Sequence, residues 1–522
     1  MKIILSGYNV DTEVLKQLKN GTHDGSDNVT PEVISAAYAR ISRDPRSVDE
    51  LRAESRDKIK SARKSNKNIV FQMSHHSVAE HAALNYDIIG ISRLAIEALE
   101  AHRLCSFTEK SQRYITLDGD FVMPTEFTSE EKNLFTELTK EQNNFYHQLL
   151  PKLTQHQFET NPELARIATE KQNEGKSDKN NREKNTLEGW AKEDARYVLN
   201  LATEGQLGFT ANARNLEHVI RDFKYHPLAE VREMGDKLYQ EAKKVVPSLI
   251  IMADEGAFKE TQGTSLQEDF LKKGRNDMVE ATSLLIEKVS DLFNYDDPLL
   301  EDFDEISMEP VPKGYVDRLI ISALIANNSS LSIEEADLLY SNIDDDTKVA
   351  YLKDSLQNLG KFDSMPREFE TADLTFEVVM SSSCYAQMKR HRMCTLLPGE
   401  YNTDLGVTIP ESIKEVGKET NFRNIIDQTE QFVDFINENH PETPELSDYC
   451  LTNAHQRRVI VKTNIRELYH FSRMREDAHA QWDIRYKANK MVNLAKEVAP
   501  LTTMFMGGKH EFDNIRKEIY KK

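Results

Sequence analysis

Cysteine, positive net charge and long apolar runs are scarce in this sequence, and each scarcity excludes a class of protein. The 522 residues include four cysteines, whose spacing matches neither a zinc site nor a disulfide framework and suits a reducing cytosol. The formal net charge is −20, which argues against nucleic acid or an acidic membrane surface as the main partner. An anionic ligand would therefore need a locally basic pocket, so clusters of Arg and His become informative.

The sequence also lacks membrane-spanning segments, a signal peptide and the common phosphate-binding loops. No stretch approaches the roughly 18 apolar residues that a membrane-spanning helix needs, and the start, Met1–Gly7, has too short an apolar core for a signal peptide. Neither a P-loop nor G-x-G-x-x-G joins a predicted strand to a predicted helix, which excludes the common phosphate cradles. With 39% hydrophobic and 30% charged residues, the composition predicts an ordinary globular protein in the cytoplasm.

Hydrophobic patterns predict the same order of elements in each half of the chain. Ala83–Ile91 carries apolar residues on both faces and predicts a buried strand, after which Ser92 caps a helix that ends near Arg103. Leu374–Met380 predicts a matching strand, followed by a matching helix over Ser383–Arg390. Other patterns predict helices over 49–64 and 130–150 and a short strand over 121–124.

Short words recur in the same order in both halves. The word His-Arg-hydrophobic-Cys occurs at His102 and at His391, and Asn-x-Arg-x-Leu-x-His occurs at Asn212 and at Asn464. A repeat of two large units indicates a fused pair of domains rather than a solenoid. The prediction is a first copy, a connecting helix with an acidic linker, and a second copy, at residues 1–262, 263–309 and 310–522.

The sequence contains one segment with metal-ligand residue types and two cysteines that could be nucleophiles. His75-His-Ser-Val-Ala-Glu-His81 has metal-ligand residue types, but its spacing fits neither H-E-x-x-H nor H-x-x-E-H, which favours a hydrogen-bonded cluster that ends a helix or holds a cofactor. Cys105 and Cys394 each follow His-Arg after one residue, which is suggestive of a nucleophile beside a base. Both lie among apolar residues, so burial is the favoured interpretation.

Two groups of polar residues point to an anionic ligand. Residues 101–114 bring Arg and His donors close to Glu and Ser, which suits a phosphate or the edge of a base, although a charged helix end followed by a loop has the same composition. At Asn212 and Asn464, an amide, a guanidinium and an imidazole open an amphipathic helix, where an anion gains from the helix dipole. A capping Asn explains only the first residue of each set.

These residues resemble the signature of the flavin-dependent thymidylate synthases. That signature is R-H-R, seven residues and Ser, with Glu before the Ser and Arg after it. An H-x-S/T-x-x-E-H element lies upstream, and N-A-R followed by R-x-x-x-H-A-Q-W-E lies downstream. Residues 75–114 match apart from the first Arg, and residues 464–484 match strongly. The resemblance covers nearly the whole chain in two copies and implies an α+β fold of two tandem domains, each a mainly antiparallel sheet packed with long helices.

The two copies depart from the family pattern in complementary ways. In the first copy, the Gln, the leading Arg and the late Arg of one half-site are replaced by Ala98, Ala101 and Phe223. In the second copy, the other half-site is replaced, and its positions hold Pro398, Glu400, Asn402 and Asp448. Each copy thus keeps the half that the other has lost. The resemblance therefore implies one composite nucleotide site and one dead site per chain.

The resemblance also implies an activity and a set of site residues. The activity is conversion of dUMP to dTMP with FAD, NADPH and methylenetetrahydrofolate, in a homodimer that forms a pseudo-tetramer, without nucleic acid, membrane or metal. Arg475 is the implied catalytic residue. The implied dUMP contacts are Gln387, Arg390, Glu109, Ser111, Gln112, Arg113, Arg196 and Arg475. The implied FAD contacts are Arg390, His391, Arg392, Asn464, Arg466, His470, Ser77, His75, His102, Arg103, Asn212 and Arg214.

Two alternatives stay open at this point. One is a related flavoenzyme that methylates or hydroxymethylates another pyrimidine nucleotide in the same site. The other is a catalytically degenerate paralogue that binds nucleotide or flavin, or that only assembles.

Overall fold

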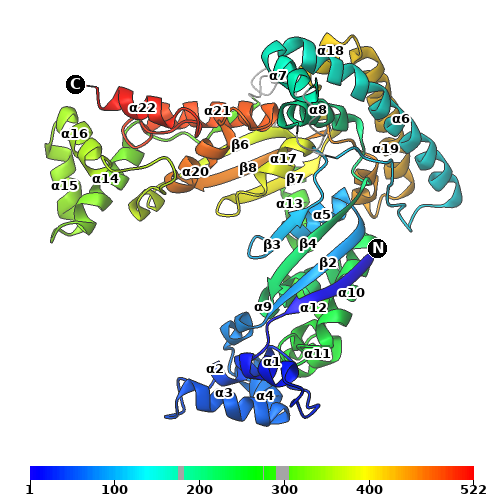
Figure 1. Ribbon diagram of the computed structural model, residues 1–522, viewed down its shortest axis with the longest axis vertical. Coiled ribbons are helices and arrows are strands. Elements are labelled where there is room, and N and C mark those ends of the chain that lie inside the picture. The colour runs from blue at the N-terminus through cyan, green and yellow to red at the C-terminus, as the bar shows by residue number, and fades with distance from the viewer. Residues whose placement is uncertain (114, 174–180, 274, 290–304, 522) are drawn as a thin grey trace. The chain divides into compact units, whose positions relative to one another are not determined.

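The computed structural model describes residues 1–113, 115–173, 181–273, 275–289 and 305–521 (Figure 1). These residues form two compact units. The first comprises Met1–Asp297 and Thr420–Leu451, and the second comprises Pro298–Glu419 and Thr452–Lys522. Each unit contains a four-stranded antiparallel sheet with helices, which confirms the predicted α+β class.

The sheet of the first unit has the order β1-β2-β4-β3. Its strands are β1 (Lys2–Tyr8), β2 (Ala83–Ser92), β3 (Ser106–Glu109) and β4 (Glu204–Asn212). The predicted strand at 83–91 is present, but only one of its faces is buried, with Leu84, Tyr86 and Ile88 facing the core. Gly90 has a φ of 74° at a register shift in β2, a backbone conformation that glycine adopts without strain.

The sheet of the second unit has the equivalent order, β5-β6-β8-β7. Its strands are β5 (Ile306–Met308), β6 (Asp373–Ser381), β7 (Thr395–Tyr401) and β8 (Gln456–Asn464). The registers also agree. Ala83 pairs with Asn212 where Asp373 pairs with Asn464, and Glu109 pairs with Leu207 where Pro398 pairs with Val459. Residues of the two copies can therefore be compared position by position.

Buried hydrogen bonds fix the helix that follows the second strand of each sheet. In the first unit, Ser92 caps α5 (Arg93–Glu100), and its hydroxyl donates to Glu230 of α10 (Ala229–Lys243) at 2.6 Å. In the second unit, Ser381 caps α17 (Ser382–Met388), and its hydroxyl donates to Asp483 of α21 (Trp482–Val498) at 2.6 Å. Both helices lead into the His-Arg words, so these caps set where those residues lie.

The last strand of each sheet also leads directly into a capped helix. The Asn212 side chain accepts from the Asn215 backbone N–H at 2.9 Å and opens α9 (Ala213–Lys224). The Asn464 side chain accepts from the Glu467 backbone N–H at 2.8 Å and opens α20 (Ile465–Arg475). Phe223 and Arg475 lie the same number of residues beyond these caps, so they occupy equivalent positions near the ends of the two helices.

The first unit includes a helix from the second half of the sequence. Helix α19 (Glu419–Asn439) lies along α6 (Ser129–Thr160) (Figure 1). In their contact, Phe432 stacks on Phe135 with ring centroids 6.1 Å apart. Gln142 donates to the Thr429 hydroxyl at 3.0 Å in the same contact. The first unit therefore requires residues from both halves of the chain.

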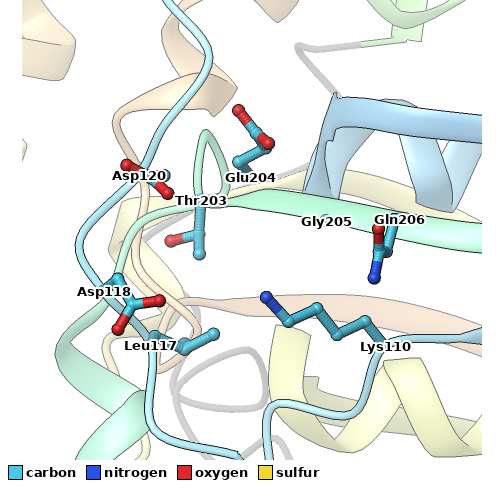
Figure 2. A pocket seen from close by; sticks show the side chains of 8 residues that line it. All are labelled: Lys110, Leu117, Asp118, Asp120, Thr203, Glu204, Gly205 and Gln206. Carbon is cyan, nitrogen blue, oxygen red and sulfur yellow. The ribbon is translucent and has the colours of Figure 1, made fainter. Parts of the chain in front are cut away.

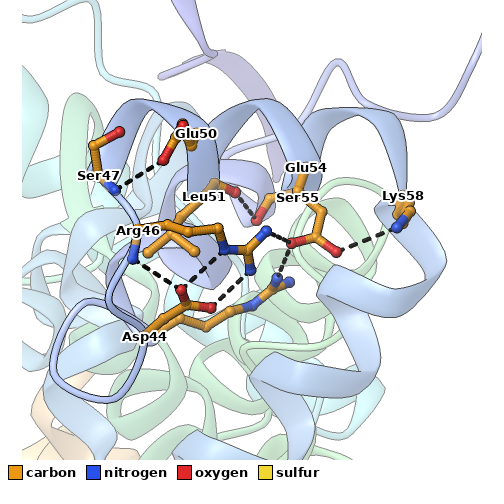
Figure 3. A network of polar contacts seen from close by, with 9 residues as sticks. Asp44, Arg46, Ser47, Glu50, Leu51, Glu54, Ser55 and Lys58 are labelled. Atoms are coloured by element: carbon orange, nitrogen blue, oxygen red, sulfur yellow. Dashed lines mark hydrogen bonds and ion pairs between the residues drawn. The ribbon is translucent and has the colours of Figure 1, made fainter.

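Charged side chains organise the N-terminal helices α1 (Thr12–Lys19), α2 (Glu32–Tyr38), α3 (Val48–Asp57) and α4 (Ile59–Asn66). Figure 3 shows Arg46 between Asp44 and Glu54, with ion-pair distances of 2.7 and 2.8 Å. Ser47 and Glu50 form a capping box at the start of α3. The single helix predicted over 49–64 is wrong in one respect, because the backbone leaves helical geometry at Lys58.

The remaining helices complete the two units. They are α7 (Pro162–Asn173), α8 (Arg182–Ala195), α11 (Glu255–Gln262), α12 (Leu266–Lys273), α13 (Arg275–Val289), α14 (Tyr315–Asn327), α15 (Ile333–Asn342), α16 (Asp345–Ser355), α18 (Glu411–Glu415) and α22 (Phe512–Ile519). Short helices are η1 (Lys67–Gln72), η2 (His76–His81), η4 (Arg196–Val198), η5 (Ile251–Ala253), η8 (Arg367–Glu370), η9 (Thr403–Leu405) and η10 (Pro444–Tyr449). Across the described ranges, every helix is too short or too polar to cross a membrane.

Several expected boundaries differ from the observed elements. The helix predicted over 130–150 is longer, since α6 continues to Thr160. The strand predicted over 121–124 is wrong, because Phe121 makes only an isolated bridge to Thr203. The predicted linker at 263–309 contains α12, α13 and β5, and its residues 290–304 lie outside the described residues. The boundaries predicted for the two copies stay a prediction.

Candidate functional site

In the second unit, a hydrogen-bonded cluster surrounds the Arg475 guanidinium at the end of α20. Arg475 Nε donates to His391 Nε2 at 2.9 Å, and Arg475 Nη2 donates to the Gln387 backbone carbonyl at 3.1 Å. Its Nη1 lies 3.4 Å from Gln387 Oε1. The fold thus brings together three residues that the sequence assigns to the site, from the end of α17 and the end of α20.

The neighbours of His391 define its protonation state. The ring is 4% exposed, and its Nδ1 lies 3.4 Å from Glu467 Oε1. An arginine side chain only donates hydrogen bonds, so His391 Nε2 must be the acceptor and Nδ1 must carry the proton. Burial lowers the pKa of His391, against the opposing effect of Glu467, and so favours this neutral form.

Gln387 is held from a second direction. It is 6% exposed, and its Nε2 donates to Gln481 Oε1 at 3.1 Å. The same Gln481 oxygen accepts from the Ile484 backbone N–H at 3.2 Å and caps α21. Because the cap fixes Gln481, the orientation of the Gln387 amide is also fixed. The Arg475 cluster is therefore anchored to two helices.

Polar groups at the rim of the cluster suit a phosphorylated ligand. Arg390, Arg392 and His470 are exposed around buried His391, and the His391 and His470 ring centroids are 5.7 Å apart. Two guanidinium groups and an imidazole are donors that match phosphate or pyrophosphate oxygens. This donor set fits the pyrophosphate and ring of a flavin dinucleotide, the cofactor that the sequence resemblance implies.

The equivalent place in the first unit has lost its cation. Phe223 occupies the position of Arg475, and its ring packs edge-on against His102 at 5.5 Å between centroids. Burial lowers the pKa of His102 to about 4, and an Asp222 carboxylate oxygen lies 3.8 Å from its Nδ1. This half-site of the first copy has changed from a polar cluster to an aromatic contact.

The first unit instead gathers the other set of predicted cations, around the buried carboxylate of Glu193. Arg113 binds Glu193 Oε2 through Nε at 2.8 Å and through Nη2 at 2.7 Å. Ser111 Oγ accepts from the Arg113 backbone N–H at 3.1 Å. Arg196, 6% exposed, donates to the Glu193 backbone carbonyl at 3.3 Å, and burial lowers its pKa.

Glu109 and Gln112 flank this group on the chain. Glu109 ends β3 opposite Leu207, and Gln112 lies half-buried in the following turn. Glu109, Ser111, Arg113 and Arg196, the residues that the first copy keeps, thus lie on one strand end, one turn and one short helix.

The second copy shows the opposite arrangement at these positions. Strand β7 continues to Tyr401, and Asn402 accepts from the Asp404 backbone N–H at 2.8 Å to start a short helix. Arg457 Nε donates to the Gly399 carbonyl at 2.7 Å and stacks over Tyr401 at 4.2 Å. The segment that holds Ser111 and Arg113 in the first copy is therefore an extended, acidic edge in the second.

The arginines of the two Asn-x-Arg motifs form ion pairs with glutamates of their own units. Arg466 binds Glu370 Oε1 at 2.7 Å and the Met365 carbonyl at 2.7 Å, while Arg214 binds Glu80 Oε1 at 2.5 Å. These ion pairs tie α20 to η8 and α9 to η2. A flavin role for these two arginines, and for the capping residues Asn212 and Asn464, stays a prediction.

The weaker sequence candidates are placed as follows. His75 and Ser77 are exposed before and within η2, and His75 Nε2 lies 3.4 Å from Arg43 Nη2. Arg103 is exposed at the end of the α5 turn. Cys105 and Cys394 are 2% and 4% exposed, and burial raises the pKa of Cys394 to about 12, which disfavours a nucleophilic role.

Within the described part of the chain, one group of residues has metal-ligand chemistry. The ligand atoms of His391, Glu467 and His470 lie within 4.8 Å of one another. Both ring nitrogens of His391 already face partners, and the Arg475 guanidinium on one of them opposes a second positive charge. The group therefore fits a hydrogen-bonded cluster better than a cation site.

A small hollow lies near the end of β3 (Figure 2). It has a volume of about 50 Å³, and its lining residues are Lys110, Leu117, Asp118, Asp120, Thr203, Glu204, Gly205 and Gln206. Figure 2 shows the Lys110 side chain extended along the space, with the three carboxylates across from it. The volume is too small for a nucleotide and the carboxylates repel a phosphate, so this hollow is separate from the anion contacts.

Comparison with known proteins decides the family. The family model of the thymidylate synthase complementing protein matches residues 26–248 and 317–501. The chain belongs to this family. The two matched regions confirm the predicted family and its presence in two copies.

The individual relatives share less than a third of their residues with this chain. The UPF0159 protein of Thermoplasma acidophilum is 22% identical over 467 residues, which cover 83% of this chain and 86% of that protein. The flavin-dependent thymidylate synthase of Clostridium tetani is 29% identical over 229 residues, which cover 42% of this chain and 80% of that enzyme. Among solved structures, the UMP/dUMP methylase PolB from Streptomyces cacaoi covers 51% of this chain with a TM-score of 0.31 and 16% identity, and 96% of its own chain is covered.

Two residues of the site were missed in the sequence. Glu467 sits beside His391, and the signal for it was its place one turn before His470 within the Asn-x-Arg word. Glu193, which holds Arg113, precedes the predicted Arg196 by one helical turn. Each could have been found by asking which carboxylate orients the neighbouring imidazole or guanidinium.

Proposed function

We propose that the protein is an FAD-dependent thymidylate synthase, converting dUMP to dTMP with methylenetetrahydrofolate and NADPH. The observation that carries the proposal is the Arg475 cluster, a guanidinium held by His391 and Gln387 at 2.9 and 3.1 Å. A half-buried, oriented cation of this kind suits charge that develops on a bound pyrimidine.

The phosphate of dUMP requires local positive charge, because the chain as a whole carries −20. Arg113, Arg196 and Arg390 are the residues proposed to supply it. Glu193 holds Arg113 in the free protein, and a doubly charged phosphate is a stronger partner for the same guanidinium. Ser111 and Glu109 would orient the sugar and base without forming a covalent bond.

Arg475 has the role closest to the chemistry. Its guanidinium would stabilise negative charge on a deprotonated ring nitrogen of the uracil, which makes the neighbouring ring carbon a better nucleophile toward the methylene donor. Gln387 would contact the same base edge. This mechanism needs no thiolate, in agreement with the burial of Cys105 and Cys394.

Arg390, Arg392 and His470 are the residues proposed to bind FAD, with smaller contributions from Asn464 and Arg466. When bound, the flavin supplies the hydride chemistry. The protein residues supply binding, orientation and charge.

The complementary losses in the two copies lead to one further part of the proposal. Each chain retains one complete set of nucleotide contacts, with Glu109, Ser111, Arg113 and Arg196 from the first copy and Gln387, Arg390 and Arg475 from the second. The other set is defective in both halves, with Phe223 in one and Glu400 and Asp448 in the other. We expect a homodimer of such chains.

The proposal is tested by incubating the purified protein with FAD, NADPH, methylenetetrahydrofolate and dUMP, and following dTMP by chromatography. We expect dTMP formation that depends on each component. Parallel reactions with UMP and dCMP separate this activity from that of a related pyrimidine-modifying enzyme, which would prefer one of them. A colourless protein that takes up no FAD and forms no product contradicts the proposal and favours a non-catalytic paralogue.

A further inference from the structure

Three side chains of the second unit form a chain of hydrogen bonds that ends on the proposed catalytic cation. Glu467 Oε1 lies 3.4 Å from His391 Nδ1, and His391 Nε2 accepts from Arg475 Nε at 2.9 Å. His391 is 4% exposed, and the Glu467 side chain is 11% exposed. Glu467 and Arg475 are both half-buried, so this chain of hydrogen bonds passes through a buried imidazole.

We propose that His391 is a positioning residue, whose Nε2 lone pair holds the Arg475 guanidinium for the pyrimidine, and that Glu467 fixes the tautomer that keeps this lone pair available. The inference rests on the proposed function and deepens it. It assigns His391 to the pyrimidine half of the reaction, whereas the sequence resemblance assigns it to the flavin.

The tautomer follows from the chemistry of the two partners. A guanidinium has donors only and stays protonated, so a nitrogen within 2.9 Å of it must offer a lone pair. The proton of a neutral ring is then on Nδ1, where the Glu467 carboxylate accepts it. A doubly protonated ring would lose the lone pair and would face Arg475 with like charge.

The groups around His391 favour this neutral state. Arg475, Glu467 and His470, all on α20, are the titratable groups that face the ring, and the Phe471 ring packs edge-on against it at 4.8 Å. Burial lowers the pKa of His391, and Arg475 adds to that effect. Only Glu467 acts in the opposite direction.

His391 is well placed to restrict Arg475. The contact with His391 at 2.9 Å is shorter than either contact with Gln387, and it fixes Nε while the Gln387 carbonyl fixes Nη2. A free arginine side chain has rotamer freedom to lose on ordering. Holding two edges before the substrate arrives removes part of that cost from binding.

The first unit shows what happens where the cation is absent. Its equivalents of Glu467, His391 and Arg475 are Asn215, His102 and Phe223. Asn215 donates to the Leu104 carbonyl at 3.0 Å, and His102 packs on Phe223. The carboxylate and the guanidinium have changed together while the imidazole is kept. This pattern fits a carboxylate whose purpose is to orient the imidazole toward the guanidinium.

The test is a double-mutant cycle read by calorimetric binding of dUMP to the FAD-loaded protein. We expect Arg475→Ala and His391→Phe each to weaken dUMP binding by about tenfold or more, and the double variant to bind no more weakly than Arg475→Ala alone. His391→Gln, whose side-chain oxygen can replace the Nε2 acceptor, is expected to stay within about threefold of wild type.

A second pair of variants covers the case in which His391→Phe does not fold. Glu467→Gln keeps an acceptor for His391 Nδ1 and is expected to bind dUMP almost normally, whereas Glu467→Leu is expected to bind it about tenfold more weakly. In wild type, affinity is expected to fall at acid pH, below the usual His pKa of 6.5, as the His391 ring becomes doubly protonated. His391→Gln is expected to lack that component.

Three results would overturn the inference. They are additive losses in the cycle, equal binding by Glu467→Gln and Glu467→Leu, and loss of bound flavin absorbance in His391→Phe when Arg475→Ala retains it. The last result would return His391 to the flavin site. If wild-type protein itself binds no dUMP, the proposed function fails instead, so the two failures are distinguishable.

Discussion

Replacing Arg475 with alanine is expected to lower kcat for dTMP formation by on the order of a hundredfold to a thousandfold, the usual effect of removing one preorganised donor from developing negative charge. The truncation also leaves the His391 Nε2 and the Gln387 carbonyl without their donor. Steady-state rates at saturating dUMP measure the effect. FAD retention in the same preparation shows that the unit remains folded.

The duplication offers a matched control for this substitution. Phe223 occupies the equivalent position in α9, where it is 2% exposed and packs on His102. Phe223→Leu is expected to cost some stability through lost packing but to change kcat by less than about threefold. Equal losses of turnover in Arg475→Ala and Phe223→Leu would mean that the two half-sites are equally important, contrary to the proposal.

Replacing Arg113 with alanine is expected to raise KM for dUMP by about tenfold to a hundredfold, because a charge-assisted contact to phosphate contributes roughly 1.5–3 kcal/mol. The change also leaves the buried Glu193 carboxylate without the guanidinium that binds it at 2.7 and 2.8 Å. That carboxylate would then repel the phosphate. Kinetics over a range of dUMP concentrations separate the KM effect from kcat.

Asn402 is the matched control for Arg113, since the two positions correspond in the aligned copies. Its side chain accepts one hydrogen bond, from the Asp404 backbone N–H at 2.8 Å. Asn402→Ala is expected to leave KM for dUMP within about twofold of wild type. An unchanged KM in Arg113→Ala, or a large increase in Asn402→Ala, would contradict the assignment of the phosphate contacts to the first copy.

Local sequence patterns predicted the elements that carry the site. The Ser92 cap and the Asn212 and Asn464 caps involve bonds over three residues, so the chain itself specifies them. The repeated words also brought corresponding residues to corresponding positions, and the matching registers at the Asn212 and Asn464 ends of the sheets confirm that correspondence.

Other features depend on partners far apart in the chain. The packing of Phe432 on Phe135 joins residues from different copies, and no periodicity within α19 specifies that contact. No Gly or Pro marks the break at Lys58, after which α4 packs on α2 as α3 does. The Arg113–Glu193 and His391–Glu467 pairs likewise bridge segments that only the fold brings together.

The central claim is that each chain holds one working nucleotide site built from complementary halves. The number of dUMP molecules bound per chain, measured by calorimetry on the FAD-loaded protein, tests it most directly. The account predicts one dUMP per chain in wild type, and a dissociation constant for dUMP raised about tenfold or more in both Arg113→Ala and Arg475→Ala. Two equivalent dUMP molecules per chain would contradict it.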